Sequence, residues 1–286
     1  MRVKLPDECA FDFFELTKKL GHKSDGDTIA WLLKQAESAV EGLIGKQDKK
    51  IEEKKTGELS DVEKFCGKYE VDQVWAVWDD EVDGMPRVYV RIEKLLLDEL
   101  KVEVCFLKAR ACTDEEKEWL CEKKLPMACG KFKVATLTSI VDVSDFSHRV
   151  DLGGEGATDR MCKIFSKEGT TWAYIVPRGG EIWAVFKDWN ANWTSRDFHH
   201  ARYELVEVLD EFHTEYSVMK VICLTRVGES KDVFERDFPR WRRYKRKQVL
   251  QFSHRIPASK LKVGEIEGVS NETWKLNPAA VPRHLV

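Results

Sequence analysis

Two Ser-His dipeptides are the residues of this 286-residue chain that most resemble catalytic machinery. Ser147-His148 and Ser253-His254 each place a hydroxyl beside an imidazole, as a nucleophile and its general base require. Neighbouring residues on a strand point to opposite faces of a sheet, so we expect each serine to face away from its histidine. The dipeptide also recurs within a repeated segment, which favours a structural role. We therefore predict that the protein is not an enzyme.

A concentrated basic segment lies between residues 236 and 247, where cations interleave with Trp241 and Tyr244. This composition suits phosphate contacts with bases stacked on the aromatic rings, or a nuclear-import signal. An exposed hairpin tip that balances acidic neighbours would have the same composition. The candidate DNA-binding residues of this segment are Arg240, Arg242, Arg243, Lys245, Arg246 and Lys247.

Several large aromatic residues could assemble a cage for a methylated ammonium group, which is attracted to ring faces by cation–π interaction. Trp75 and Trp183 stand in continuous apolar runs, so we expect them in the core. Trp189 and Trp193 lie in a polar loop and are better binding candidates. The candidate ligand-binding aromatics are Trp78, Tyr89, Trp189, Trp193 and Tyr203.

The composition of the chain limits which other functions are expected of it. A net charge of −3 argues against a generally basic nucleic-acid coat, and 43% hydrophobic residues allow about two domains with real cores. The eight cysteines never form a Cys-x-x-Cys pair, so we predict reduced, mostly buried thiols, with no metal site and no cofactor. The chain has no run of about twenty apolar residues and no apolar signal region, which predicts an intracellular protein without a membrane partner.

The elements that position these residues form an internal repeat. Val74–Val77 recurs as Ile182–Val185, Tyr89–Leu95 parallels Tyr203–Leu209, and Phe146–Val150 parallels Phe252–Ile256. The order is the same in both copies. We expect a β-rich domain over residues 67–286, with pseudo-repeats at about 67–152 and 172–262 and a tail to residue 286. The strand pattern of each copy resembles the first strands of a small SH3-like or Tudor-like barrel.

Residues 1–45 have a different pattern, that of a short strand and two amphipathic helices, so the fold class is α+β. Pro6 suits a first helical turn, and Gly21 stops the first helix. About forty residues rarely build a sufficient core, so dimerisation would cover the apolar stripes. A helical hairpin packed on the rest of the chain is the alternative. The predicted dimerisation residues are Phe13, Leu16, Leu20, Ile29, Leu32 and Leu33.

Residues 46–66 connect these two parts and are predicted to be a charged linker. Lysine and glutamate crowd around a single Ile51 there, without an apolar stripe that could dock the segment.

The N-terminal pattern resembles the TCP domain of plant transcription factors. The resemblance is carried by Arg2 to Pro6, Phe13 to Leu20, Gly21 to Thr28 and Ile29 to Glu37. In that family a basic segment and a short strand contact DNA, while the helices dimerise in an arrangement similar to a ribbon-helix-helix protein. Most of the basic segment is missing, so the resemblance leaves Arg2 and Lys4 as DNA-binding residues. Residues 1–45 hold six Lys and Arg against eight Asp and Glu, which predicts weak autonomous DNA binding.

Residues 67–286 resemble the plant domain of unknown function found C-terminal in DnaJ-like (J-domain) proteins. The matching segments are Asp83 to Arg87, Leu125 to Gly130, Pro177 to Ala184, Phe252 to Pro257 and Leu276 to Pro282. The resemblance implies no established chemistry. The chain has no His-Pro-Asp tripeptide, so the J-domain itself is absent from it.

Together these patterns predict a nuclear plant protein that acts as a transcriptional regulator or cofactor. The N-terminal helices would pair with TCP-family transcription factors as hetero- or homodimers, DNA is a further candidate partner, and the β-rich domain would recruit a chromatin or chaperone-linked protein. The alternative hypothesis is a reader of chromatin or peptides that is dimerised by the N-terminal helices and has no role on DNA.

Overall fold

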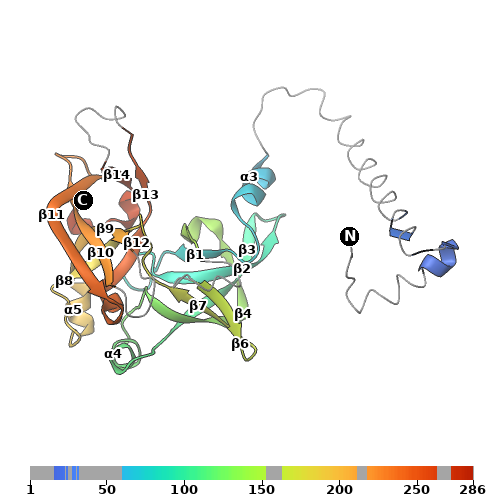
Figure 1. Cartoon of the computed structure of the whole chain (residues 1–286), viewed down its shortest axis with the longest axis horizontal. Coiled ribbons are helices and arrows are strands. Elements are labelled where there is room, and N and C mark those ends of the chain that lie inside the picture. The colour runs from blue at the N-terminus through green and yellow to red at the C-terminus, as the bar shows by residue number, and fades with distance from the viewer. Residues whose placement is uncertain are drawn as a thin grey trace. The chain divides into compact units, whose positions relative to one another are not determined.

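The structure is a computed structural model that describes residues 16–22, 24, 28–29, 31, 60–152, 163–210, 218–262 and 272–285 (Figure 1). The chain divides into two units, residues 1–60 and 61–286. In the first unit, residues 16–20 are helical, as are residues 28, 29 and 31. Gly21 has a φ of 66°, which only glycine adopts freely and which suits the end of a helix. The predicted residues Arg2, Lys4, Phe13, Leu32 and Leu33 lie outside the described residues.

Seven antiparallel strands form one curled sheet in the first half of the second unit (Figure 1). Apolar and polar residues alternate along β3, so one side of that strand is buried, whereas all four residues of β1 are buried. Edge strands β5 and β6 lie at opposite ends of the sheet. In spatial order the strands are β5 (Phe146–Val150), β1 (Val74–Val77), β2 (Val88–Leu96), β3 (Lys101–Arg110), β4 (Gly130–Asp142), β7 (Thr170–Ile175) and β6 (Lys163–Lys167).

A second seven-stranded sheet repeats this topology, strand for strand and in the same chain order. The expectation of a β-rich domain is therefore confirmed. Its strands, again in spatial order, are β12 (Phe252–Ile256), β8 (Ile182–Lys187), β9 (Arg202–Asp210), β10 (Val218–Arg226), β11 (Val233–Lys245), β14 (Thr273–Leu276) and β13 (Ala258–Lys260).

The boundaries of the two copies differ from the expected ones. Strands β6 and β7 pair with each other, and β7 pairs with β4, so the first sheet extends beyond residue 152 to Ile175. Residues 172–175 therefore lie in the first sheet. In the first sheet Tyr89 pairs with Ala76, and at the same place in the second sheet Leu205 pairs with Ala184. The residue that corresponds to Tyr89 is therefore Leu205, and the expected match with Tyr203 was wrong by two residues. A two-residue shift keeps every side chain on its face, and alternation cannot reveal it.

A short helix, α3 (Asp61–Lys68), corrects the expected extent of the charged linker. Phe65 on this helix is buried, and its ring lies 5.1 Å from that of Tyr69, which lies 5.1 Å from Trp75 on β1. Residues four apart share a helix face, so Phe65 and Tyr69 supply the apolar stripe that composition alone concealed. The helix covers the outer face of the first sheet, where Trp75 packs with Phe146.

The corresponding face of the second sheet is covered by the first half of the unit instead. Ala128, Cys129 and Val176 pack there against Trp183 and Phe252. Trp75 and Trp183 are both buried, as the apolar runs around them predicted. Residues of the first half therefore complete the core on this face of the second sheet.

A helical insertion between β3 and β4 also joins the two halves. Helix α4 (Asp114–Lys117) starts at the N-cap Thr113 and continues as the π-helical turn η1 (Glu118–Glu122). Trp119 of this turn packs beside Phe186 of β8 and Phe198 of α5 (Ser195–His199). The remaining short elements are η2 (Val143–Asp145), η3 (Arg246–Gln251), η4 (Pro278–Ala280) and η5 (Arg283–Leu285). Within the described ranges, no helix has the length and apolarity needed to cross a bilayer.

Candidate functional site

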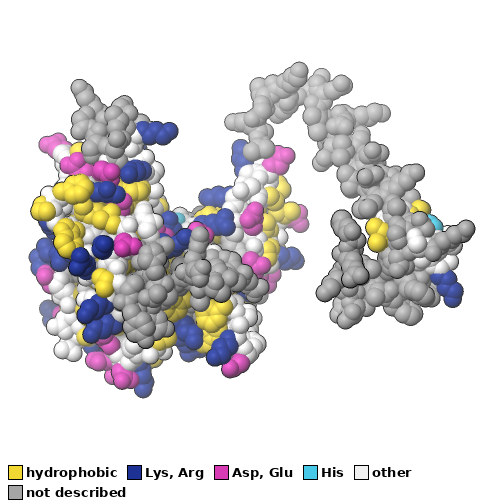
Figure 2. Space-filling model, viewed as in Figure 1, with side chains coloured by type: hydrophobic (Ala, Val, Ile, Leu, Met, Phe, Trp, Pro, Cys, Tyr) yellow, Lys and Arg dark blue, Asp and Glu magenta, His cyan; other side chains and the backbone are white. Residues whose placement is uncertain are grey.

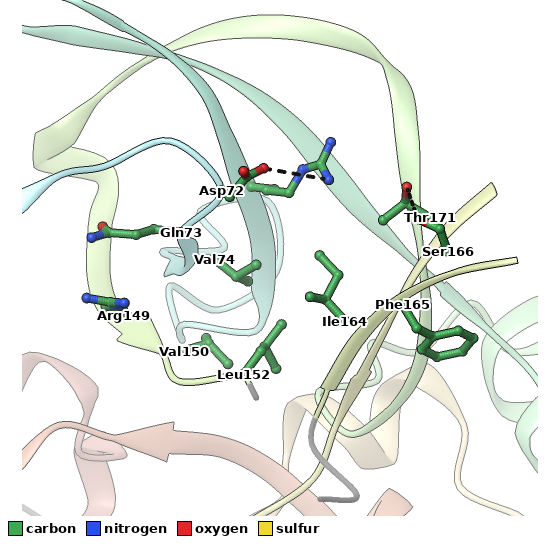
Figure 3. A pocket seen from close by; sticks show the side chains of 11 residues that line it. Asp72, Gln73, Val74, Arg149, Val150, Leu152, Ile164, Phe165, Ser166 and Thr171 are labelled. Carbon is green, nitrogen blue, oxygen red and sulfur yellow. Dashed lines mark hydrogen bonds and ion pairs between the residues drawn. The ribbon is translucent and has the colours of Figure 1, made fainter. Parts of the chain in front are cut away.

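A pocket of about 370 Å³ lies in the first sheet, between the start of β1 and strands β6 and β7 (Figure 3). Val74, Val150, Leu152 and Ile164 form its apolar part. Its volume falls at the low end of the range for sites that hold small organic molecules.

Polar side chains surround this apolar part (Figure 3). Arg91 of β2 donates to Glu93 at 2.7 Å, and its Nη1 lies 4.0 Å from Asp72. Ser166 and Thr171 lie across the pocket, with their hydroxyl oxygens 3.4 Å apart. Gln73 and the exposed Arg149 also belong to the lining, but their side chains point away from Val74 and Ile164 (Figure 3). No local sequence pattern marks this site, because its residues come from five separate segments of the chain.

The Ser-His dipeptides are hydrogen bonded, contrary to the expectation that they face apart. Ser147 Oγ lies 3.1 Å from His148 Nδ1, and Ser253 Oγ lies 2.9 Å from His254 Nδ1. The pairing register shifts at both places, so each serine is the extra residue of a β-bulge. A bulge breaks strict alternation and turns neighbouring side chains to the same side.

The Ser253-His254 pair belongs to a chain of hydrogen bonds in which the donor and the acceptor of each bond can be assigned. Arg87 donates to the Ser253 hydroxyl at 2.9 Å, and His254 Nε2 donates to the Ala280 carbonyl at 2.9 Å. The neutral His254 ring must then accept at Nδ1, so Ser253 donates to it. Arg87, Ser253 and His254 are all buried. This arrangement holds β12 against the β1–β2 loop and the C-terminal turn.

Burial sets the protonation of both histidines. Desolvation, aided by the nearby Arg255 and His254, lowers the pKa of His148 to about 3. Desolvation and the Arg87 charge lower the pKa of His254 to about 3 as well. Both rings are therefore neutral at physiological pH. Ser253 as a whole is only 1% exposed.

The candidate ligand-binding aromatics occupy three different surroundings. Tyr89 is buried and donates to the Ala128 carbonyl at 2.8 Å. Trp78 is half-buried against the core of the second sheet. Trp189, Trp193 and Tyr203 lie together around Trp119 and Phe186, with the ring centroids of Trp189 and Trp193 at 5.9 and 6.5 Å from that of Trp119. Burial raises the pKa of the Tyr203 hydroxyl, which accepts from Arg87 at 3.3 Å.

The basic segment is neither a loop nor a hairpin tip, because most of it forms strand β11. Arg240 and Arg242 pair with Glu204 on β9, the latter at 2.9 Å. Arg246 is half-buried with its guanidinium 4.3 Å from the Tyr174 ring, and burial lowers its pKa. Arg240 and Arg242 are exposed as well, and among the described residues the exposed Arg243, Lys245 and Lys247 have no ion-pair partner. Over the described part of residues 61–286, the face in Figure 2 shows Lys and Arg interspersed with Asp and Glu.

The described dimerisation candidates, Leu16, Leu20 and Ile29, are each half-buried within the single chain. Six cysteines fall in the described residues; Cys105, Cys129 and Cys223 are buried, while Cys66, Cys112 and Cys121 are exposed. The expectation that most thiols are buried therefore fails for half of these six. No group of metal-ligating residues occurs among the residues that the structure describes.

Comparison with known proteins finds two families in the chain. The family model described as "Domain of unknown function (DUF3444)" matches residues 50–175 and again residues 174–265, once for each sheet. The model described as "TCP family transcription factor" matches residues 1–88. No solved structure matches the chain.

Curated relatives match the N-terminal part. Transcription factors TCP20, TCP6 and TCP16 of Arabidopsis thaliana are 52%, 56% and 46% identical over 44, 39 and 44 residues. These alignments cover 15%, 14% and 15% of this chain, and 14%, 16% and 27% of the relatives. The chain thus aligns with less than a third of each relative's length. Since the repeated match covers more than half of the sequence, the chain belongs to the DUF3444 family and carries a TCP-like segment at its N-terminus.

Proposed function

We propose that the chain is a nuclear transcriptional regulator that dimerises through its TCP-like helices and recruits a partner through its DUF3444 domain. The match of residues 1–88 to the TCP family carries this proposal, together with the identity to three transcription factors. In this proposal the helices pair in a ribbon-helix-helix-like arrangement with a second TCP domain, of the same or another chain.

Side-chain exposure supports a role for the helices in pairing. Leu16, Leu20 and Ile29 keep part of their apolar surface open in the single chain, while Lys18 and Lys19 between the two leucines are exposed. A second chain that covers such surface gains about 25 cal/mol for each Å² removed from water.

The charge distribution supports weak binding to DNA by the chain alone. Phosphate contacts depend on unpaired Lys and Arg, and Arg240 and Arg242 already pair with the carboxylates of Asp237 and Glu204. Arg243, Lys245 and Lys247 remain available on β11 and just after it. The partner of the β-rich domain is then a chromatin or chaperone-linked protein rather than DNA.

The test is a competition on DNA, followed by fluorescence anisotropy. A labelled GC-rich duplex carrying a complete TCP domain is titrated with the full chain, and the chain alone serves as the control. We expect DNA occupancy to fall, because mixed dimers have fewer phosphate contacts. Leu20→Glu should abolish the effect, since it puts a charge in the pairing surface, whereas Lys19→Glu on the exposed side should keep it. Unchanged occupancy with the wild-type chain would contradict the proposal.

A reader of modified peptides is the second candidate, and one observation favours it. The buried indole Nε1 of Trp189 has no hydrogen-bond acceptor in the part of the chain that the structure describes. A bound peptide could supply that acceptor beside Trp193 and Tyr203. In a test on an array of histone-tail peptides, the wild-type chain should bind a peptide. Trp189→Ala should abolish this binding, whereas the control Trp241→Ala, on an exposed side chain, should preserve it. Indifference to the whole array would count against this candidate.

A further inference from the structure

Strand β4 is paired along most of its length on one side but only at its beginning on the other. On the first side, β3 pairs with it between Lys131 and Asp142. On the second side, β7 pairs with it only from Gly130 to Lys133, and no other strand of the described residues pairs with it. The second half of β4 is therefore an open sheet edge, whose outward N–H and C=O groups can pair with a further strand.

The side chains along this edge suit such pairing. Residues 134–141 read Val-Ala-Thr-Leu-Thr-Ser-Ile-Val, without a charge, a proline or a glycine. Leu137 is 82% exposed and Ile140 is 61% exposed. Uncharged β-branched residues favour the addition of a strand, and soluble proteins commonly protect an open edge against it with charges, proline or a covering segment.

The second sheet has an equivalent edge on β11. Strand register places Cys105 of β3 and Ile222 of β10 at equivalent positions. Their partners, Thr138 and Trp241, are therefore equivalent, and each strand has a register shift just before this residue. Beyond it β4 continues as Ser-Ile-Val-Asp, whereas β11 continues as Arg-Arg-Tyr-Lys.

Proline and cations protect the edge of β11. Pro239 lies at its register shift, and proline has no N–H to donate to a further strand. Trp241 is exposed, but the Arg243 guanidinium lies 5.0 Å from its ring. Exposed Lys and Arg oppose pairing between two such edges, because like charges repel. The chain thus protects one of two equivalent edges and leaves the other neutral.

We propose that the open edge of β4 pairs with the same edge of a second copy of this chain. In a twofold antiparallel arrangement centred on Ile140, this side chain meets its own counterpart, and Ser139 meets Val141 of the second copy. No like charges face each other there, so the edge is complementary to itself. The same arrangement of β11 would place Arg243 opposite Arg243. This contact is separate from the pairing of TCP-like helices proposed above, so either one can fail without the other.

Sedimentation equilibrium of the full chain tests the proposal in a variant that lacks helix pairing. Leu20→Glu removes that pairing in the proposed function, so dimers of this variant report on the β-rich unit. A short edge buries a small area, and we expect a weak dimer with a Kd on the order of 10 µM. If the variant stays monomeric at about ten times this concentration, the proposal is overturned and the edge is left to a strand of another protein.

A second substitution in the same variant locates the contact. Ile140→Arg gives β4 the residue that β11 carries as Arg243, and it should raise the Kd about tenfold or more. Leu97→Arg, a matched change of an exposed apolar residue in the β2–β3 turn, should leave the Kd unchanged. Circular dichroism and thermal unfolding confirm that each variant is folded. Dimers that survive Ile140→Arg, or that Leu97→Arg disrupts equally, would show that β4 is not the contact.

Hydrogen exchange of the full wild-type chain gives a readout that needs no substitution. Raising the protein concentration should slow exchange of the amides in residues 137–142, because pairing occupies their N–H groups. Residues 241–245 on the protected edge of β11 should exchange at the same rate throughout. Exchange in residues 137–142 that does not depend on concentration would contradict the proposal.

Discussion

His254 shows how one side chain can organise its surroundings without taking part in chemistry. Its two ring nitrogens are used by Ser253 and by the Ala280 carbonyl, and the ring is fully enclosed. Arg87 completes the chain of donors from a different part of the sequence. A buried network of this kind stabilises one arrangement of the chain, because every alternative leaves a buried polar group without a partner.

The two buried histidines predict a stability that depends on pH. Their folded pKa values of about 3 lie below the value of 6.5 in the unfolded chain. The unfolded state therefore takes up protons first, and the free energy of unfolding falls as pH decreases from 6.5 toward 3. Because both histidines contribute, the free energy of unfolding falls by up to about 2.7 kcal/mol for each pH unit.

Urea unfolding between pH 7.5 and pH 5 measures this effect. His148→Asn should flatten the dependence by removing one of the two titrating groups. His199→Asn, a change of an exposed histidine, should leave the slope as it is. A slope that is the same in wild type and His148→Asn would show that these buried rings do not control the acid sensitivity.

At the scale of elements, insertions between strands give the two sheets their different roles. The β3–β4 insertion carries Trp119 into the aromatic cluster of the second sheet, where it packs with Phe186 and Phe198. The β8–β9 insertion brings Trp189 and Trp193 to the same cluster. Both copies have the same strands, and the insertions add contacts between the copies.

Trp119 is thus expected to be a main determinant of domain stability. It is 1% exposed, and its indole donates to the Pro126 carbonyl at 3.0 Å. Trp119→Ala should lower the free energy of unfolding by about 3 to 5 kcal/mol, because it empties a large buried volume. The matched change Trp241→Ala, on a side chain that is 56% exposed, should cost less than about 0.5 kcal/mol. Urea denaturation followed by far-UV circular dichroism compares the two, and similar losses would contradict the assignment.

At the scale of the whole β-rich unit, the two copies have the same strand topology but different side chains in their interiors. In one copy Trp274 and Arg236 donate to Glu207, while in the other Arg91, which holds the place of Glu207 in the strand register, lines a pocket. Arg87 of the first copy is bound to Ser253 of the second, and Arg255 of the second donates to the Arg149 carbonyl of the first at 3.0 Å. These contacts, with the shared core, make the copies parts of a single structure.

Much of this organisation is predictable from the sequence. Hydrophobic alternation and the recurring Trp-Ala-Val and Phe-Ser-His-Arg segments predict a duplicated β-rich domain, and the N-terminal residues predict a TCP-like module. Both are local patterns that need no knowledge of folding. The pocket could not be predicted, because its wall combines residues from segments that only the sheet brings together.

The sequence by itself determined that several strands occur twice in the same order and that Trp75 and Trp183 lie in a core, because alternation and composition act over a few neighbouring residues. Tertiary structure alone decided the rest. Bulges turned Ser147 and Ser253 toward their histidines, pairing with Glu204 neutralised part of the basic segment, and the register placed Ala173 where the second copy has Trp274. Those outcomes depend on which strand lies beside which, and that is a property of long-range packing.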